Sequence, residues 1–376
     1  MVKEYRNVFK EAGYSEEEID KRVNDTFEMI FYGADSFFSM VDETMGYIED
    51  TGNNDVRSEG MSYGMMMTVQ MDRKKEFDAL WTWTKKYMYM SEGVNSGYFA
   101  WSVGTDGSKN AYGPAPDGEE FFAMALFFAS HRWGDGEGIY NYSKEAKDLL
   151  HTCVHKGETG NGRSMWDENN YLIRFITECD FTDPSYHLPH FYELFSKWAN
   201  KEDCSFWKKA AKASREYLKK ACHPVTGLNP EYSTFEGEPY YGDQEIFGRH
   251  DWYYSDAYRT IGNIGLDYQW CKNDLVDGEW HQKTANNLQV FFCKTVGDCN
   301  RGVYTVDGQI LDVSALHPVA IVATNAQASL ASNGDYALQC VKEFWDTPLR
   351  KGERRYYDNC LYMFAMLALS GRYRIW

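Results

Sequence analysis

The sequence contains no long apolar run, and its first residues are polar. Nothing in it approaches the ~18 consecutive apolar residues of a membrane-spanning helix. Residues 1–10 lack the apolar stretch that forms the centre of a secretory signal. The nine cysteines are odd in number and show no paired spacing, which is typical of reduced thiols. We therefore expect a cytoplasmic protein that does not act at a membrane.

Positive charge is also scarce in this chain. The 39 lysines and arginines are outnumbered by 56 aspartates and glutamates, and the net charge is −17. Nucleic acids and anionic membrane surfaces are therefore poor partners, and a neutral ligand suits the charge better. Aromatic residues, in contrast, make up 16% of the 376 residues. Core packing explains most of them, but sugar-binding surfaces also need exposed aromatic rings.

Helical periodicity recurs along the whole chain, in two kinds of segment. Amphipathic segments with lysine and glutamate on one side span residues 15–31, 74–87, 143–155, 203–222, 277–294 and 336–345. Segments that begin polar and then become apolar or small on all sides start near Ser58, Asp117, Ser185, Ser255, Leu316 and Tyr356. A helix that is apolar all round is buried. The pattern predicts an all-α fold, an (α/α)6 barrel of six inner and six outer helices, as a single domain over residues 1–376.

The inner helices of such a barrel run parallel, so side chains at their starts meet on one face. Glu59 lies at one of these starts, beside glycines and the apolar run 65–67. Desolvation there would raise its pKa and keep it protonated near neutral pH. Asp256 opens another buried helix. One protonated and one ionised carboxyl group in a cleft are the minimum equipment for glycoside hydrolysis.

Each carboxylate also has a purely structural interpretation. Glu59 could simply favour the electropositive start of its helix. Asp256 could cap a helix and pair with Arg259 three residues later. Asp117, between Pro116 and a glutamate pair, could be a helix N-cap. Position alone leaves these alternatives open.

Metal ligands are not evident in the sequence. His187, His190 and Glu193 are spaced by threes in a pattern that matches no known zinc site. Cys293 and Cys299 are too isolated to form one. We expect neither a metal nor an organic cofactor.

At residues 115–133 the chain resembles the signature of family 8 glycoside hydrolases. Pro116 and Glu119 depart from the signature, but the key Asp117 is in place. The stretches around Glu59 and Asp256 also resemble this family. Residues 183–191, 316–318 and 355–360 resemble one subgroup in particular, the reducing-end xylose-releasing exo-oligoxylanases.

The resemblance implies an inverting hydrolase of xylo-oligosaccharides that works without a cofactor. Glu59 would be the general acid and Asp256 the general base. Tyr186 would help to hold the attacking water, and Asp117 would bind the sugar at the cleavage subsite. Further sugar contacts are expected from Trp101, His317, Tyr357 and Arg259. Within the subgroup, the loop at 316–318 closes the cleft beyond the leaving sugar, which implies release of a single xylose from the reducing end.

The sequence also fits other functions. An endo-acting xylanase, cellulase or chitosanase of the same family is the nearest alternative. A sugar epimerase on the same barrel would rely on paired histidines, for which His187 and His317 are available. A noncatalytic sugar-binding scaffold would not need both Glu59 and Asp256, and His317 could be incidental to a helix start.

Overall fold

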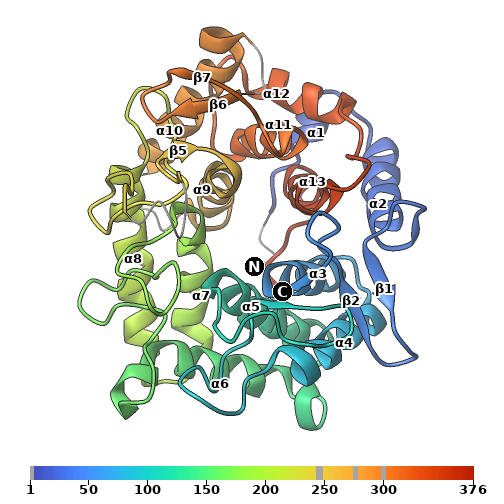
Figure 1. Cartoon of the computed structure of the whole chain (residues 1–376). Helices are drawn as coiled ribbons and strands as arrows, with labels where there is room; N and C mark the ends of the chain where they lie inside the picture. The colour runs from blue at the N-terminus through green and yellow to red at the C-terminus, as the bar shows by residue number, and fades with distance from the viewer. Residues whose placement is uncertain (1–3, 243–248, 274–277, 298–301) are drawn as a thin grey trace.

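Two concentric sets of helices form the molecule (Figure 1). The computed structural model describes residues 4–242, 249–273, 278–297 and 302–376. The inner helices are α3 (Ser58–Gln70), α5 (Pro116–Trp133), α7 (Pro189–Trp198), α9 (Tyr258–Cys271), α11 (Pro318–Gln327) and α13 (Arg355–Leu369). The outer helices are α2 (Glu16–Tyr32), α4 (Lys74–Trp83), α6 (Tyr142–His155), α8 (Cys204–Ala221), α10 (Gly278–Val290) and α12 (Ala337–Asp346). The predicted (α/α)6 barrel is confirmed.

Burial separates the two sets as their sequences predict. In α3 every residue but Glu59 is buried, and in α5 the first fourteen residues are buried. Helix α8 instead buries one stripe, which includes Trp207, Ala211 and Leu218, and leaves its lysines toward water. None of the described helices is long and apolar enough to span a membrane.

Proline sets the start of three inner helices. Pro116, Pro189 and Pro318 each occupy the first turn, where a missing N–H costs no hydrogen bond. The helix that we predicted to start near Ser185 therefore begins only at Pro189, after the 3₁₀ turn η4 (Pro184–Tyr186). Another 3₁₀ turn, η5 (Ser255–Ala257), precedes α9.

Short turns and strands complete the chain. The turns are α1 (Val8–Glu11), the π-helical η1 (Thr84–Met88) and η6 (Phe291–Val296), and the 3₁₀ turns η2 (Gly138–Tyr140), η3 (Lys156–Thr159) and η7 (Ala328–Leu330). The strands are β1 (Phe38–Met40), β2 (Gly46–Ile48), β3 (Val56–Arg57), β4 (Ser102–Val103), β5 (Trp252–Tyr253), β6 (Gly302–Thr305) and β7 (Ile310–Ser314). They pair antiparallel as β1–β2, β3–β4 and β5–β6–β7.

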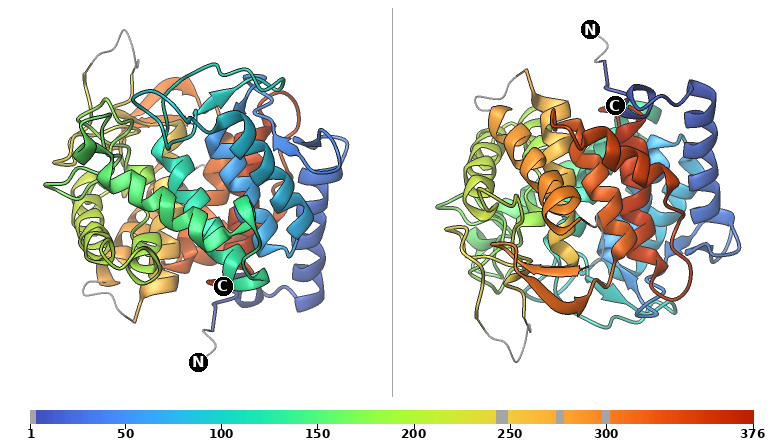
Figure 2. Two further views of the ribbon diagram at one scale, coloured as in Figure 1. Left: turned by 90° about the horizontal axis from the view of Figure 1, so that it is seen from below. Right: turned by 90° about the horizontal axis from the view of Figure 1, so that it is seen from above.

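The strands organise one end of the barrel. Strand β3 runs directly into α3, and β5 leads through η5 into α9. The hairpin of β6 and β7 lies at the end opposite the two chain termini (Figure 2). Pairing of β3 with β4 and of β5 with β6 therefore holds the starts of two inner helices in place.

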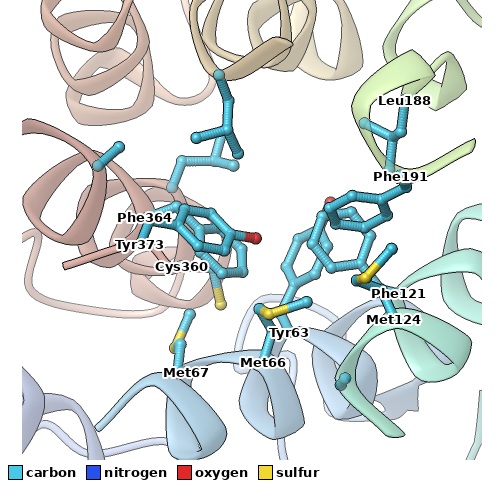
Figure 3. Close-up of a cluster of buried hydrophobic side chains, with 14 of the residues drawn as sticks. Tyr63, Met66, Met67, Phe121, Met124, Leu188, Phe191, Cys360, Phe364 and Tyr373 are labelled. Atoms are coloured by element: carbon cyan, nitrogen blue, oxygen red, sulfur yellow. The ribbon is translucent and has the colours of Figure 1, made fainter. Parts of the chain in front are cut away.

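The centre of the barrel is filled with aromatic and sulfur-containing side chains (Figure 3). Met66 and Met67 from α3 face Phe121 from α5 and Phe364 from α13, and all of them are at least nine-tenths buried. One hydrophobic cluster includes residues from Val8 to Tyr373. The methionine run is thus core, and the assignment of a single domain to residues 1–376 stays a prediction.

Candidate active site

Four carboxyl groups from separate parts of the chain surround one guanidinium group, that of Arg259 in the first turn of α9. Its Nη1 lies 2.8 Å from Glu59 Oε2 and 3.1 Å from Asp117 Oδ2. Its Nη2 lies 3.4 Å from Asp256 Oδ1 and 3.5 Å from Asp183 Oδ2. Arg259 is 5% exposed. One buried cation does not balance four carboxylates, so part of this cluster must be protonated.

Glu59 is one member of the cluster that is suited to hold a proton near neutral pH. Burial raises its pKa, Arg259 opposes this, and the charges of Asp117 and Asp256 raise it further, to about 7. Burial likewise raises the pKa of Asp117 to about 6 and that of Asp183 well above its ordinary value. The desolvation of Glu59 expected from its sequence context is therefore present in the structure.

Asp256 has a different environment. Its side chain is 25% exposed, compared with 15% for Glu59. Its backbone N–H donates a hydrogen bond of 3.3 Å to Glu231, whose other carboxyl oxygen lies 2.5 Å from His250 Nδ1. A carboxylate that keeps contact with water and with an arginine is suited to take a proton from water. The roles of Glu59 as the acid and of Asp256 as the base stay predictions.

Close packing around the start of α3 brings Glu59 within hydrogen-bond distance of Tyr356. The Tyr356 hydroxyl donates a hydrogen bond of 2.7 Å to Glu59 Oε1. A Cβ atom on Gly60 would lie 2.7 Å from that hydroxyl oxygen, and one on Gly118 would lie 2.6 Å from the Ser58 side chain. Glycine at these two positions thus lets Tyr356 and α5 approach the start of α3.

Two hollows of unequal size meet at the carboxyl groups of Glu59 and Asp256. The larger, of about 370 Å³, is lined by Arg57, Ser58, Glu59, Trp101, Ala115, Asp117, Phe175, Ile176, Tyr186, Tyr232 and Asp256. The smaller, of about 140 Å³, is lined by Asp50, Gly52, Asn53, Arg57, Glu59, Ser255, Asp256, Leu316, His317, Arg354, Tyr356 and Tyr357. Glu59 and Asp256 line both, so a chain of sugars that fills both hollows would cross between them.

A third hollow, of about 1140 Å³, lies beside the N-terminal segment and the ends of α7 and α9. It is larger than the other two, but none of the predicted site residues lines it. Volume alone therefore does not locate the chemistry.

Trp101, predicted to contact the sugar, and Tyr186, predicted to hold the attacking water, both line the larger hollow. Trp101 is 38% exposed, and the guanidinium carbon of Arg57 lies 5.3 Å from the centre of its ring. Tyr186, in η4, is buried, and Arg259 lies 5.4 Å from its ring centre. An exposed indole suits stacking on a sugar face. The water-holding role of Tyr186 stays a prediction.

His317 and Tyr357 lie together on the smaller hollow, with ring centres 4.6 Å apart. Asp358 accepts a 2.8 Å hydrogen bond from His317 Nδ1 and one of 2.9 Å from the Ala320 N–H. Because the carboxylate of Asp358 also pairs with Arg350, it acts as an acceptor and places the imidazole proton on Nδ1. The Nε2 atom of His317 is then left for a hydrogen bond with a ligand hydroxyl.

The structure does not support the capping alternatives for Asp117 and Asp256. Asp117 is not an N-cap: α5 begins at Pro116, so Asp117 lies inside the first turn, and it accepts a hydrogen bond from the next residue's N–H. Asp256 makes no capping hydrogen bond, although its predicted ion pair with Arg259 is present. Arg259 contacts carboxyl groups and lines neither of the two hollows, so a direct sugar contact from it stays a prediction.

The histidines considered for a metal or an epimerase do not gather at the site. His187 is fully buried between Thr182 and Ser214, at 2.9 Å from each hydroxyl, and burial lowers its pKa to about 3. Glu193 pairs with Arg215. Since His187 lines neither hollow, it is not paired with His317. Cys299 lies outside the described residues.

Some functional neighbours were not predicted from sequence. Glu231 lies in a loop with no helical pattern, and only its position next to Asp256 in space marks it. Asp183 belongs to the stretch that carried the family resemblance, yet its contact with Arg259 has no local signal.

Comparisons with known proteins agree with this geometry. The family described as "Glycosyl hydrolases family 8" matches residues 37–371. The reducing end xylose-releasing exo-oligoxylanase of Halalkalibacterium halodurans is 58% identical over 380 residues, which cover 100% of this chain and 95% of that enzyme.

Solved structures give the same result. The crystal structure of a reducing-end xylose-releasing exo-oligoxylanase complexed with xylose has a TM-score of 0.94 and 57% identity, and covers 99% of this chain and 98% of that one. The structure of such an enzyme with one glutamate replaced by alanine, complexed with xylobiose, matches with the same TM-score, identity and coverage of both chains. Fold, carboxyl cluster and full-length similarity agree, and this chain belongs to family 8 of the glycosyl hydrolases.

Proposed function

We propose that this chain hydrolyses xylo-oligosaccharides and releases one xylose from their reducing end, with inversion at the cleaved carbon. One observation carries the proposal: the carboxyl groups of Glu59 and Asp256 lie where a large and a small hollow meet. The relatives named above support the choice of sugar, because structures of such enzymes contain xylose and xylobiose.

In the proposed reaction each carboxyl group has one task. Glu59 gives its proton to the glycosidic oxygen as the bond to the anomeric carbon breaks. A water on the other face of the sugar attacks that carbon and loses a proton to Asp256. Glu59 ends ionised and Asp256 protonated, and exchange with solvent restores both. The Asp256 side chain is 25% exposed and that of Glu59 is 15% exposed, so the base is the more accessible to water of the two.

The size of the smaller hollow supports removal of a single sugar. It has less than half the volume of the larger hollow, and Leu316 and His317 are part of its lining. Asp358 holds the His317 ring from behind, so the Nε2 atom is available to the hydroxyl of a terminal sugar. We place the leaving xylose in the smaller hollow and the remaining sugars in the larger one, against Trp101.

Labelling at the reducing end tests this assignment. Xylotriose with an isotopic label at its reducing-end anomeric carbon should give labelled xylose and unlabelled xylobiose. Label in xylobiose would mean that the small hollow does not hold a single leaving sugar. No cleavage by the wild-type chain would support a noncatalytic sugar-binding protein. A folded Glu59→Gln variant serves as the control for contaminating activity.

An endo-acting hydrolase of the same family is the second candidate. It would cut longer oligomers at internal bonds and would need both hollows open along the whole chain of sugars. The observation that disfavours it is the pair His317 and Tyr357 on the smaller hollow. Incubation with xylohexaose separates the two, because an endo enzyme would release short oligomers before xylose.

A further inference from the structure

A cluster of possible metal ligands lies away from the hollows described above, between two outer helices. His151 and His155 are four residues apart on α6, so they share one face of the helix. Asp203 immediately precedes α8. His151 Nδ1 lies 3.0 Å from Asp203 Oδ2, and His155 Nε2 lies 2.7 Å from Asp203 Oδ1. We call these three residues the α6–α8 cluster.

We propose that the α6–α8 cluster binds a divalent transition metal such as Zn²⁺ at a structural site. Two imidazole nitrogens and one carboxylate are a donor set that zinc accepts in proteins. The ligand atoms of the three residues all lie within 4.8 Å of one another. Ligands of tetrahedral zinc are separated by about 3.3 Å, given bonds of about 2.0 Å. The two imidazole nitrogens already lie 3.0 and 2.7 Å from the Asp203 carboxylate, close to that spacing.

The surroundings of His155 support this proposal independently. Its Nε2 faces Asp203, and its Nδ1 lies 2.6 Å from Glu158 Oε1. A histidine that binds a metal through one nitrogen nearly always donates the other N–H to a carboxylate or carbonyl. Glu158 is already in that position, so it would orient the ring and fix the proton on Nδ1.

Exposure allows a metal to enter and a water to complete its coordination. The Asp203 side chain is fully buried, whereas those of His151 and His155 are 46% and 32% exposed. The cluster therefore has a fixed buried carboxylate on one side and solvent on the other. His155 also lies in the last turn of α6, where the helix dipole favours positive charge.

The expected consequence is a connection between α6 and α8. Asp203 is 48 positions beyond His155, so the metal would join two outer helices that are distant in sequence. None of the three residues lines the two hollows at Glu59 and Asp256. The metal would therefore raise the melting temperature and leave the hydrolytic mechanism unchanged.

Calorimetric titration of the metal-free full-length chain with Zn²⁺ tests the site. The wild type should bind one equivalent at the cluster, and Zn²⁺ should raise its melting temperature. His151→Gln and Asp203→Asn should each lose that equivalent and the thermal shift. Glu158→Gln should retain the ligands but bind about tenfold more weakly, as for other residues that orient a ligand. His131→Gln, which changes a histidine on α5 bonded to the Trp376 carbonyl, is the matched control.

Zn²⁺ binding by the His151→Gln variant shows whether the ion sits at the α6–α8 cluster. If His151→Gln binds Zn²⁺ as the wild type does, the ion sits elsewhere and the proposal is wrong. Absence of binding or of any thermal shift in the folded wild type would overturn it equally. Because His151 is exposed at the surface, its variant should fold, so loss of binding there cannot be attributed to unfolding. Tetrahedral Co²⁺ absorption in the wild type, absent in His151→Gln, would add support for the coordination.

Discussion

The Tyr356 hydroxyl donates a hydrogen bond of 2.7 Å to Glu59 Oε1, which links the start of α13 to the proposed general acid. This bond favours the ionised form of Glu59 and lowers its pKa, while burial has the larger, opposite effect. The balance leaves a pKa of about 7. Glu59 must be protonated to act, so kcat/KM should fall as pH rises above about 7.

Replacing Tyr356 by phenylalanine should raise the pKa of Glu59. The fall of kcat/KM at alkaline pH, which we call the alkaline limb, should therefore move to higher pH. Loss of one hydrogen bond of about 1 kcal/mol corresponds to a shift of somewhat less than one pH unit. The pH dependence of kcat/KM gives the measurement. Tyr357→Phe is the control, because the Tyr357 hydroxyl bonds to the Ser255 carbonyl and not to Glu59. A limb that stays in place in Tyr356→Phe would contradict the assignment of the pKa to Glu59.

Neutral replacements of the two carboxyl groups test their roles. Glu59→Gln and Asp256→Asn keep the size of the side chain and one acceptor oxygen, so both should fold. Each should lower kcat by about 10² or more, the usual contribution of a general acid or base. In Glu59→Gln the alkaline limb should also disappear. Wild-type turnover in either folded variant would remove that residue from the mechanism.

Gly60→Ala should disturb both stability and activity. Alanine improves helix propensity by about 1 kcal/mol. However, its Cβ would lie 2.7 Å from the Tyr356 hydroxyl oxygen and 2.8 Å from a ring carbon. Crowding in a packed core costs about 1–3 kcal/mol, so the clash should prevail and displace Tyr356 from Glu59.

Thermal unfolding and kcat/KM check this prediction. Gly113→Ala offers a control, because its Cβ would meet nothing closer than 3.7 Å. A Gly60→Ala variant as stable and as active as the wild type would show that Tyr356 has room to move.

His317→Ala should weaken the closure of the smaller hollow. We expect reducing-end-labelled xylotetraose to give its label only in xylose with the wild type and partly in xylobiose with the variant. Asp358→Asn should act in the same direction but less strongly, because it removes the charge that orients the His317 ring. Chromatography of the first products provides the readout. An unchanged product pattern in His317→Ala would mean that other residues limit the hollow.

Much of the fold follows from local patterns. A helix that is apolar on all sides must be inside, so the alternation of such helices with amphipathic ones predicts the barrel directly. The positions of Glu59 and Asp256 at the starts of parallel inner helices likewise predict that they share a face. Desolvation of Glu59 is predictable because its neighbours in the chain are small or apolar.

Other features depend on contacts that no local pattern records. Arg259 joins four carboxyl groups that are spread from residue 59 to residue 256. The strands have two to five residues, too few to show alternation. Asp117 resembled a cap because its neighbours favour one, whereas Pro116 shifts the helix start by one residue. The support of His317 by Asp358 spans 41 positions.

The anomeric form of the first product tests the central claim most directly. The Arg259 guanidinium touches an oxygen of both Glu59 and Asp256, which keeps their nearest oxygens within about 9 Å, the upper end of the spacing of an inverting pair. Proton NMR recorded during hydrolysis of a β-linked xylo-oligosaccharide should show the α-anomer at the newly formed reducing end before mutarotation. A β-anomer that appears first would mean retention of configuration and would contradict the role of Asp256 as the base.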